Sequence, residues 1–233
     1  MQQDINIGQS PILKRCPSCF GTANLFTPTR CSNAIKMIQT QQTTDDVMIP
    51  LLLPTNFDRL CLLLHKCMKQ KALRPGKQLH AVLLTSGVGV NDDNVNSKLV
   101  GVYASCSDLK SAEWVFSETL NPNVFALNWM VSASAFHGLY SDAVGYFQLM
   151  QEMKMSPNLY TLYSVLKACV GLMDVRNGKE VHAVVLRKGF DDDILLSNDL
   201  IDMYCKCENL RYARKVFDKM TSRDVITWTI SGH

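Results

Sequence analysis

The sequence predicts an all-α protein, an α-solenoid of about five and a half helix-turn-helix repeats, and three observations support this fold class. Apolar residues recur every three or four positions, as on one face of a helix. A small residue followed by bulky residues three and four places later occurs five times, at intervals of 36, 31, 35 and 35 residues. Each interval holds two helices and two turns. The five trios are Gly76, Leu79, His80; Ala112, Val115, Phe116; Ala143, Tyr146, Phe147; Gly178, Val181, His182; and Ala213, Val216, Phe217.

A longer echo supports the same register. Gly-Lys-Gln-Leu-His-Ala, starting at Gly76, returns as Gly-Lys-Glu-Val-His-Ala, starting at Gly178. A single small hairpin hides only one side of each helix, so it needs similar neighbours to close a core. We therefore expect a repeat array over residues 57–233, divided into 57–92, 93–123, 124–158, 159–193, 194–224 and a partial repeat at 225–233.

Local signals place the helices within these repeats. Pro75 lies near the start of the second helix of the first repeat, where a missing amide hydrogen is tolerated. Ser107 and Asp108, before Leu109, indicate a helix cap in the second repeat. In the third repeat Gly138 indicates the turn, and Ser141 with Asp142 indicates the start of the next helix.

Composition argues against several function classes. The net charge of +3, with 20 Lys and Arg against 18 Asp and Glu over residues 57–233, is too small for bulk attraction to nucleic acid. An anionic partner must therefore meet a local surface. No apolar run approaches the roughly 20 residues of a membrane helix, so we expect no membrane association.

Cysteines and sequence motifs predict neither a metal nor catalysis. The sequence has nine cysteines, an odd number, and no secretory signal precedes them. Both observations favour reduced thiols over disulfides. Cys16-Pro-Ser-Cys19 is a lone C-x-x-C and cannot complete a four-ligand zinc site. The H-x-E and P-C-x-x-C elements of deaminases, the P-loop, G-x-S-x-G and H-E-x-x-H are absent from the sequence. We predict no catalytic residue, no cofactor and no small-molecule substrate.

The two ends differ from the repeats. Residues 1–56 lack a helical period, carry nine Ser or Thr before Asp45 and a single acid, Asp4, in their first 44 residues. This composition is typical of an organelle transit peptide; the alternative is a leader without an address. At the other end, Ile226, Trp228 and Ile230 start a sixth repeat without a partner helix, so we expect a truncated chain whose native form continues with further repeats.

Three phrases of the array resemble plant pentatricopeptide repeat proteins. They are Asn-Asp-Leu-Ile-Asp-Met-Tyr-Cys-Lys-Cys from Asn198, Ala-Arg-Lys-Val-Phe-Asp-Lys-Met from Ala213 and Gly-Lys-Glu-Val-His-Ala from Gly178. The alternation of repeat lengths resembles the subclass with mixed long, short and standard repeats. The resemblance implies a right-handed α-solenoid that binds single-stranded RNA of a mitochondrion or chloroplast, one base per repeat. It also implies a role as an adaptor in editing, processing or stabilisation of transcripts, with RNA-processing or editing proteins as further partners.

In that family the fifth and last residues of a repeat discriminate bases. The resemblance thus implies an adenine-preferring pair in the second repeat, a pyrimidine-preferring pair in the third and a uracil-preferring pair in the fifth. The first and fourth repeats depart from the pattern at Cys61 and Tyr163. The implied core is adenine, pyrimidine, any base, uracil, from 5′ to 3′. The predicted RNA-binding residues are Ser97 with Asn123, Asn128 with Asn158, Asn198 with Asp224, and Thr229, whose partner lies beyond the sequence.

Other interpretations remain open at this point. Asn123, Asn158 and Asp224 lie at junctions, where Asn and Asp also occur simply as turn and cap residues. The chain could instead be a helical scaffold that binds proteins, although tetratricopeptide arrays keep a 34-residue period. A third interpretation is that the chain is a fragment with little binding activity. His80 and His182 take the place of Phe in other trios, which predicts packing rather than chemistry.

Overall fold

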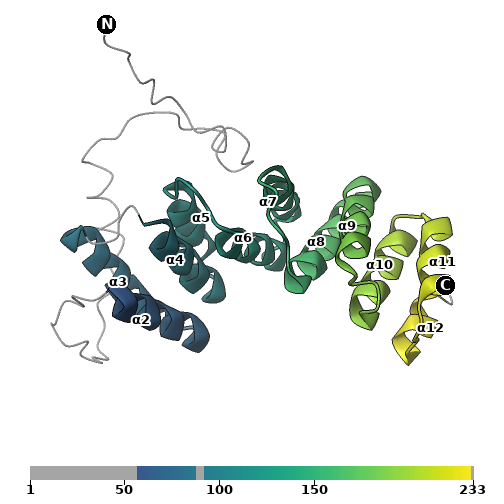
Figure 1. Ribbon diagram of the computed structural model, residues 1–233, viewed down its shortest axis with the longest axis horizontal. Helices are drawn as coiled ribbons and strands as arrows, with labels where there is room; N and C mark the ends of the chain where they lie inside the picture. Colours follow the sequence, from purple (N-terminus) through teal and green to yellow (C-terminus); the bar gives the residue numbers. More distant parts are fainter. Residues whose placement is uncertain (1–56, 88–91, 232–233) are drawn as a thin grey trace, which may run out of the picture. The chain divides into compact units, whose positions relative to one another are not determined.

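The computed structural model describes residues 57–87 and 92–231. Within these ranges the secondary structure is entirely helical, with eleven helices, α2 to α12. Figure 1 shows them along the chain. The predicted leader and its Cys16-Pro-Ser-Cys19 motif lie outside the described residues. The described part contains no helix that is both long and apolar enough to cross a lipid bilayer.

The described chain divides into two compact segments, and the boundary between them in the sequence falls between Ala126 and Leu127, inside α6. In the N-terminal segment α2 packs on α3 and α4, and α4 packs on α3 and α5. The helices of this segment are α2 (Phe57–Gln70), α3 (Leu73–Ser86), α4 (Asp93–Ser105) and α5 (Leu109–Ser117).

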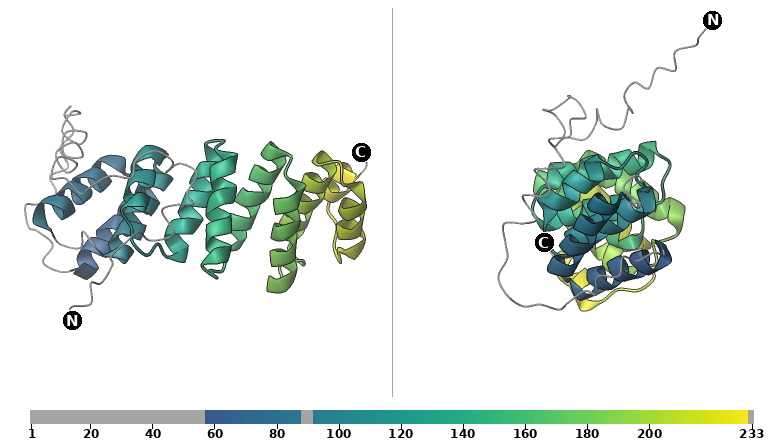
Figure 2. Two further views of the ribbon diagram at one scale, coloured as in Figure 1. Left: turned by 90° about the horizontal axis from the view of Figure 1, so that it is seen from above. Right: turned by 90° about the vertical axis from the view of Figure 1, so that its left-hand side faces the viewer.

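The C-terminal segment continues the same plan. Here α8 packs on α7, α9 and α10, while α10 packs on α9, α11 and α12. Its hairpins follow one another side by side in chain order (Figures 1 and 2). The helices are α6 (Val124–Phe136), α7 (Tyr140–Glu152), α8 (Leu159–Leu172), α9 (Val175–Lys188), α10 (Ile194–Lys206), α11 (Leu210–Lys219) and α12 (Val225–Ser231).

The apolar faces predicted from the sequence form the core of each segment. The bulky residues of the trios are buried, except His182, which is half-buried. The trio helices α3, α9 and α11 each pack on the first helix of their own repeat and of the next one. Tyr103 and Tyr204 are among the largest fully buried side chains, and the hydroxyl of each is hydrogen-bonded to a histidine of the preceding repeat. His80 Nδ1 lies 2.7 Å from Tyr103 Oη, and His182 Nδ1 lies 3.0 Å from Tyr204 Oη.

Turn and cap residues end the helices. Asp108 caps α5 by accepting a hydrogen bond from the backbone nitrogen of Ser111, as the sequence predicts. Gly138 adopts a φ of +77° in the turn between α6 and α7, a conformation that favours glycine. The prediction that Ser141 and Asp142 start α7 was slightly wrong, because the helix begins at Tyr140. Leu139 occupies its cap position without a side-chain hydrogen bond.

Together these features confirm the predicted fold class. The described residues form helix-turn-helix repeats in which first helices pack on first helices within a segment: α2 on α4 in the N-terminal segment, and α8 on α10 and α10 on α12 in the C-terminal one. This is the architecture of an α-solenoid, in which each unit buries its apolar faces against its neighbours. It places one equivalent position of each first helix in line within a segment.

Candidate nucleic-acid interface

The candidate interface consists of the fifth residue of each first helix and the last residue of each repeat. We call these two residues the fifth–last pair. The fifth positions fall one turn into their helices, and they carry Ser97 in α4, Asn128 in α6, Tyr163 in α8, Asn198 in α10 and Thr229 in α12. Because α8 packs on α10 and α10 on α12, the fifth positions of these three helices lie in a row.

In the fifth repeat the fifth–last pair is joined directly. Asn198 Nδ2 donates to Asp224 Oδ1 at 3.2 Å. Thr227, in the first turn of α12, joins both residues: its hydroxyl donates to Asn198 Oδ1 at 2.7 Å and its backbone nitrogen donates to Asp224 Oδ1 at 2.8 Å. Asn198 is only 3% exposed, so its orientation is set by these partners.

The third repeat has the same arrangement. Thr161, in the first turn of α8, donates from its hydroxyl to Asn128 Oδ1 at 2.6 Å. Its backbone nitrogen donates to Asn158 Oδ1 at 2.9 Å, which makes Asn158 the cap of α8. The hydroxyl also lies 3.0 Å from Asn158 Oδ1. Asn128 and Asn158 are thus held by the same threonine.

The fourth repeat joins its pair with different residues. Tyr163 Oη donates to Asp193 Oδ1 at 2.8 Å, and the same oxygen caps α10 by accepting from the backbone nitrogen of Leu196 at 2.8 Å. Burial, followed by this hydrogen bond and the carboxylate charge, raises the pKa of Tyr163 to about 12. Tyr163 therefore stays a neutral hydrogen-bond donor at neutral pH.

The remaining predicted residues make local contacts. Ser97 is buried, and its hydroxyl donates to the backbone oxygen of Asp93 at 2.6 Å. Asn123 accepts from the backbone nitrogen of Ala126 at 3.0 Å, as a helix cap does. Thr229 is exposed and donates to the backbone oxygen of Val225 at 2.8 Å. The structure therefore joins the fifth–last pairs of the third, fourth and fifth repeats by hydrogen bonds.

Asp224 is held in its charged form. The backbone nitrogen of Thr227 donates to this carboxylate, the Thr227 hydroxyl shares its one hydrogen between Asp224 Oδ1 and Asn198 Oδ1, and the amide of Asn198 also donates to Asp224. These bonds lower the pKa of Asp224 below the ordinary value. The ionised carboxylate has only acceptor sites. The capping oxygen Oδ1 is occupied by these donors, which leaves Oδ2 for a ligand.

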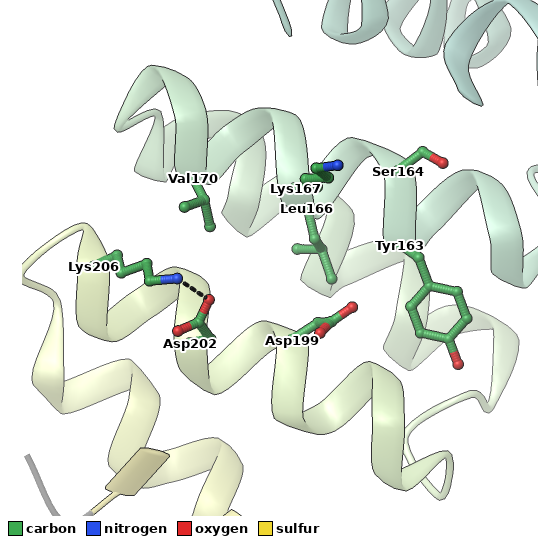
Figure 3. Close-up of a pocket in the computed structure, with 8 residues that line it drawn as sticks. All are labelled: Tyr163, Ser164, Leu166, Lys167, Val170, Asp199, Asp202 and Lys206. Carbon is green, nitrogen blue, oxygen red and sulfur yellow. Dashed lines mark hydrogen bonds and ion pairs between the residues drawn. The ribbon is translucent and has the colours of Figure 1, made fainter. Parts of the chain in front are cut away.

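A shallow pocket of about 360 Å³ lies between α8 and α10, beside the fifth position of α8. Asp199 and Asp202 project from α10 toward α8, and Lys206 bonds to Asp202 at 2.7 Å (Figure 3). Burial, together with the neighbouring charges of Asp202 and Asp193, raises the pKa of Asp199. Lys167 adds the second cation of the lining, so positive and negative charges are balanced there.

Sequence reasoning missed three participants of these clusters: Thr161, Thr227 and Asp193. It identified Tyr163 as a fifth residue but did not predict its bond to Asp193. A signal for the threonines was present, because both occupy the third position of a first helix. Their bonding partners belong to the preceding repeat, about thirty residues earlier, and no local pattern identifies such a contact.

Comparison with known families places these helices in context. A model described as "PPR repeat" matches residues 197–225, and a model described as "Pentatricopeptide repeat domain" matches residues 113–172. The matched ranges contain the fifth–last pairs of the third and fifth repeats and the fifth residue of the fourth repeat.

Several proteins of Arabidopsis thaliana are similar over most of the array. A chloroplastic pentatricopeptide repeat-containing protein is 33% identical over 76% of this chain and 26% of its own length. Another, named chloroplastic/mitochondrial, is 40% identical over 66% of this chain and 24% of its own length. The crystal structure of the pentatricopeptide repeat protein PPR10 from maize covers 87% of this chain and 33% of its own, with 18% identity and a TM-score of 0.38. This chain spans about a quarter of the length of these two Arabidopsis relatives.

Proposed function

Because this chain belongs to the pentatricopeptide repeat family, we propose that it binds single-stranded RNA in a sequence-specific way, with one base contacted by the fifth–last pair of each repeat. The observation that carries the proposal is the recurrence of the joined pair in successive repeats. Asn128 with Asn158, Tyr163 with Asp193, and Asn198 with Asp224 each combine one side chain from a first helix with the cap of the next.

The free atoms of the fifth repeat suit uracil. Asn198 Oδ1 is bonded to Thr227, and Nδ2 gives one hydrogen to Asp224 Oδ1, so the second hydrogen of Nδ2 is the donor for a base and Asp224 Oδ2 is the acceptor. The Watson–Crick edge of uracil has a donor at N3 between two carbonyl acceptors. A carboxylate oxygen accepts from N3 of uracil, whereas N3 of cytosine is itself an acceptor and would face it unfavourably.

The side-chain atoms available to a base in the third repeat differ from those in the fifth repeat at one group. Asn158 Oδ1 caps the next helix, as Asp224 Oδ1 does in the fifth repeat. The second group of Asn158 is therefore the donor Nδ2, whereas the second group of Asp224 is the acceptor Oδ2. Two outward donors, from Asn128 and Asn158, suit the N3 and O2 acceptors of cytosine. The pair therefore supports pyrimidine recognition, with cytosine favoured over uracil.

Exposed apolar side chains stand three residues before the fifth position of the last three repeats. They are Tyr160, Leu195 and Ile226. An apolar or aromatic surface beside each polar pair can stack on a base, and aromatic stacking contributes about 1–3 kcal/mol per base without sequence preference. Stacking would supply affinity while the polar pair supplies discrimination.

We place this binding in an organelle, a mitochondrion or chloroplast, as the names of the relatives suggest. The RNA core that we propose is adenine, pyrimidine, any base and uracil, read from the second to the fifth repeat. In this role the chain is an adaptor that marks a transcript site for RNA-processing or editing proteins. We propose that the fifth–last pairs contact bases and have no catalytic role.

The decisive experiment changes Asp224 to Asn in the full chain. We expect the variant to lose its preference for uracil over cytosine at the nucleotide facing the fifth repeat, by about 1–3 kcal/mol, because an acceptor becomes a donor. Fluorescence anisotropy would measure binding to labelled RNAs that differ only at that nucleotide.

Asp192→Asn is the matched control, since Asp192 is exposed and lies outside the pairs. It removes the same charge and should leave base preference unchanged. Equal affinity of the native chain for all four bases at that nucleotide, or a preference insensitive to Asp224→Asn, would refute the assignment.

A further inference from the structure

We propose that Thr161 and Thr227 are positioning residues: each fixes which way round the asparagine amide of the preceding repeat faces the RNA. The inference rests on the proposed function, because it concerns how base discrimination is set. Neither threonine is among the fifth or last residues of a repeat. Each lies at the third position of a first helix and acts on the repeat before it.

The two clusters share their geometry. Each threonine is 0% exposed, and its backbone nitrogen donates to the last residue of the preceding repeat. Its hydroxyl bonds to Oδ1 of the fifth residue and also lies within hydrogen-bond distance of Oδ1 of the last residue. The hydroxyl-to-amide distances are 2.6 Å for Thr161 and 2.7 Å for Thr227. One buried side chain thus holds both members of the fifth–last pair.

The reason an amide needs such a partner is its near symmetry. The oxygen and nitrogen of an asparagine side chain have almost the same shape, and a flip exchanges an acceptor for two donors. A threonine hydroxyl that donates to Oδ1 favours this orientation, because a flip would break that bond and require the hydroxyl to turn and accept from Nδ2 instead. In the fifth repeat the acceptor-only carboxylate of Asp224 reinforces the same orientation.

The distribution of threonine along the repeats matches this role. Where the fifth residue is Asn128 or Asn198, the third position of the following repeat is threonine. Where the fifth residue is Cys61, Ser97 or Tyr163, which have no amide to orient, that position carries an apolar residue. These apolar residues are Val95, Ala126 and Leu196, respectively.

The test replaces Thr227 by Val and by Ser in the full chain. Valine keeps the shape and loses the donor, so we expect selectivity for uracil over cytosine at the fifth-repeat nucleotide to fall by about fivefold or more. Thr227→Ser keeps the hydroxyl and should restore selectivity. Thermal melting of each variant separates a folding effect from a selectivity effect.

Thr161→Val tests the same role independently at the third-repeat nucleotide, should Thr227→Val fold poorly. Thr85→Val is the matched control, because the Thr85 hydroxyl is exposed and bonds only within α3. A folded Thr227→Val or Thr161→Val chain with native selectivity would overturn the inference.

A second readout needs no RNA and separates this inference from the proposed function. In a nitrogen–proton correlation spectrum, the side-chain amide signals of Asn198 should be shifted and slow to exchange in the native chain, and should move to ordinary positions in Thr227→Val. If the native chain shows no base selectivity, the proposed function fails. If the amide signals are unchanged by Thr227→Val, the positioning role fails.

Discussion

At the residue scale, two histidines show how a polar side chain can serve packing. His80 is buried and bonded to Tyr103, and its ring also lies 5.6 Å from that of Trp114. This confirms that His80 is a packed helix residue, as the trio pattern predicts. Burial lowers its pKa from 6.5 to about 4, so the ring is neutral in the folded chain at neutral pH.

We predict that His80 makes the folded chain less stable in acid. Between its folded pKa of about 4 and the unfolded value of 6.5, the unfolded state binds more protons, so stability falls as pH falls through this window. The loss attributable to His80 should be about 2 kcal/mol between about pH 7 and about pH 5. Urea denaturation at the two pH values measures it.

The test variant is His80→Phe combined with Tyr103→Phe, which leaves no unpaired hydroxyl and places at position 80 the residue that other trios carry. Between about pH 7 and about pH 5, the free energy of unfolding of this double variant should fall by about 2 kcal/mol less than that of the native chain. His65→Gln is the control because His65 is exposed, and it should retain the native pH dependence. Identical pH profiles for the double variant and the native chain would rule out the role of His80.

At the element scale, two glycines set how closely a second helix approaches the next first helix. A Cβ at Gly76 would lie 2.5 Å from Val102 Cγ1, and a Cβ at Gly178 would lie 2.5 Å from Met203 Sδ. The trio pattern predicted a small residue at these positions but did not explain why a small residue is needed there. The reason is close packing of α3 on α4 and of α9 on α10.

We predict that Gly76→Ala destabilises the chain more than Gly178→Ala does. Alanine normally favours a helix over glycine by about 0.5–1 kcal/mol. At Gly76 the new methyl group meets the stiff, β-branched Val102, so overpacking should dominate at about 1–3 kcal/mol. At Gly178 the thioether of Met203 can move aside. Thermal unfolding of both variants measures the difference.

A compensating variant checks the cause. Gly76→Ala with Val102→Ala should recover part of the lost stability, since it removes the methyl group that blocks the new Cβ. Equal melting temperatures for Gly76→Ala and the native chain would show that close packing of α3 on α4 does not require glycine at position 76.

At the scale of the whole molecule, cations are distributed unevenly between the two kinds of helix in the C-terminal segment. The first helices α8 and α10 carry one lysine each, Lys167 and Lys206. The second helices α9 and α11 carry most of the cations. These are Arg176, Lys179, Arg187, Lys188, Arg211, Arg214, Lys215 and Lys219. With a net charge of +3 for the chain, the RNA binding that we propose must draw its affinity mainly from contacts with bases and a few phosphates.

We predict a shallow dependence of RNA affinity on salt. Each neutralised phosphate of a single strand contributes about 0.7 to the slope of log affinity against log salt. Lys206→Gln should reduce the slope by about 0.7 if this lysine exchanges Asp202 for a phosphate. Lys215→Gln, on a second helix, is the matched control and should leave the slope unchanged. Anisotropy titrations over a salt series give both slopes, and equal reductions for the two variants would contradict the placement of RNA along the first helices.

Local information was sufficient for the fold class and for much of the helix arrangement. The three-to-four-residue spacing of apolar side chains and the recurrence of the trios are properties of short stretches, and they identified helical hairpins in series. The cap at Asp108 and the turn at Gly138 also follow from residue type. The start of α7 was displaced because Tyr140 enters the helix without a capping side chain, so no cap signal marks its true first residue.

The amino-acid sequence alone therefore determined that this protein is a series of paired helices and which residues occupy equivalent positions in each pair. Only the tertiary structure decided which polar atoms remain available to a ligand. Thr161 and Asn128 are 33 residues apart, and the bond between them exists because α8 lies against α6. Side-chain periodicity states which face of a helix is buried, whereas the orientation of an amide depends on a donor supplied by the neighbouring repeat.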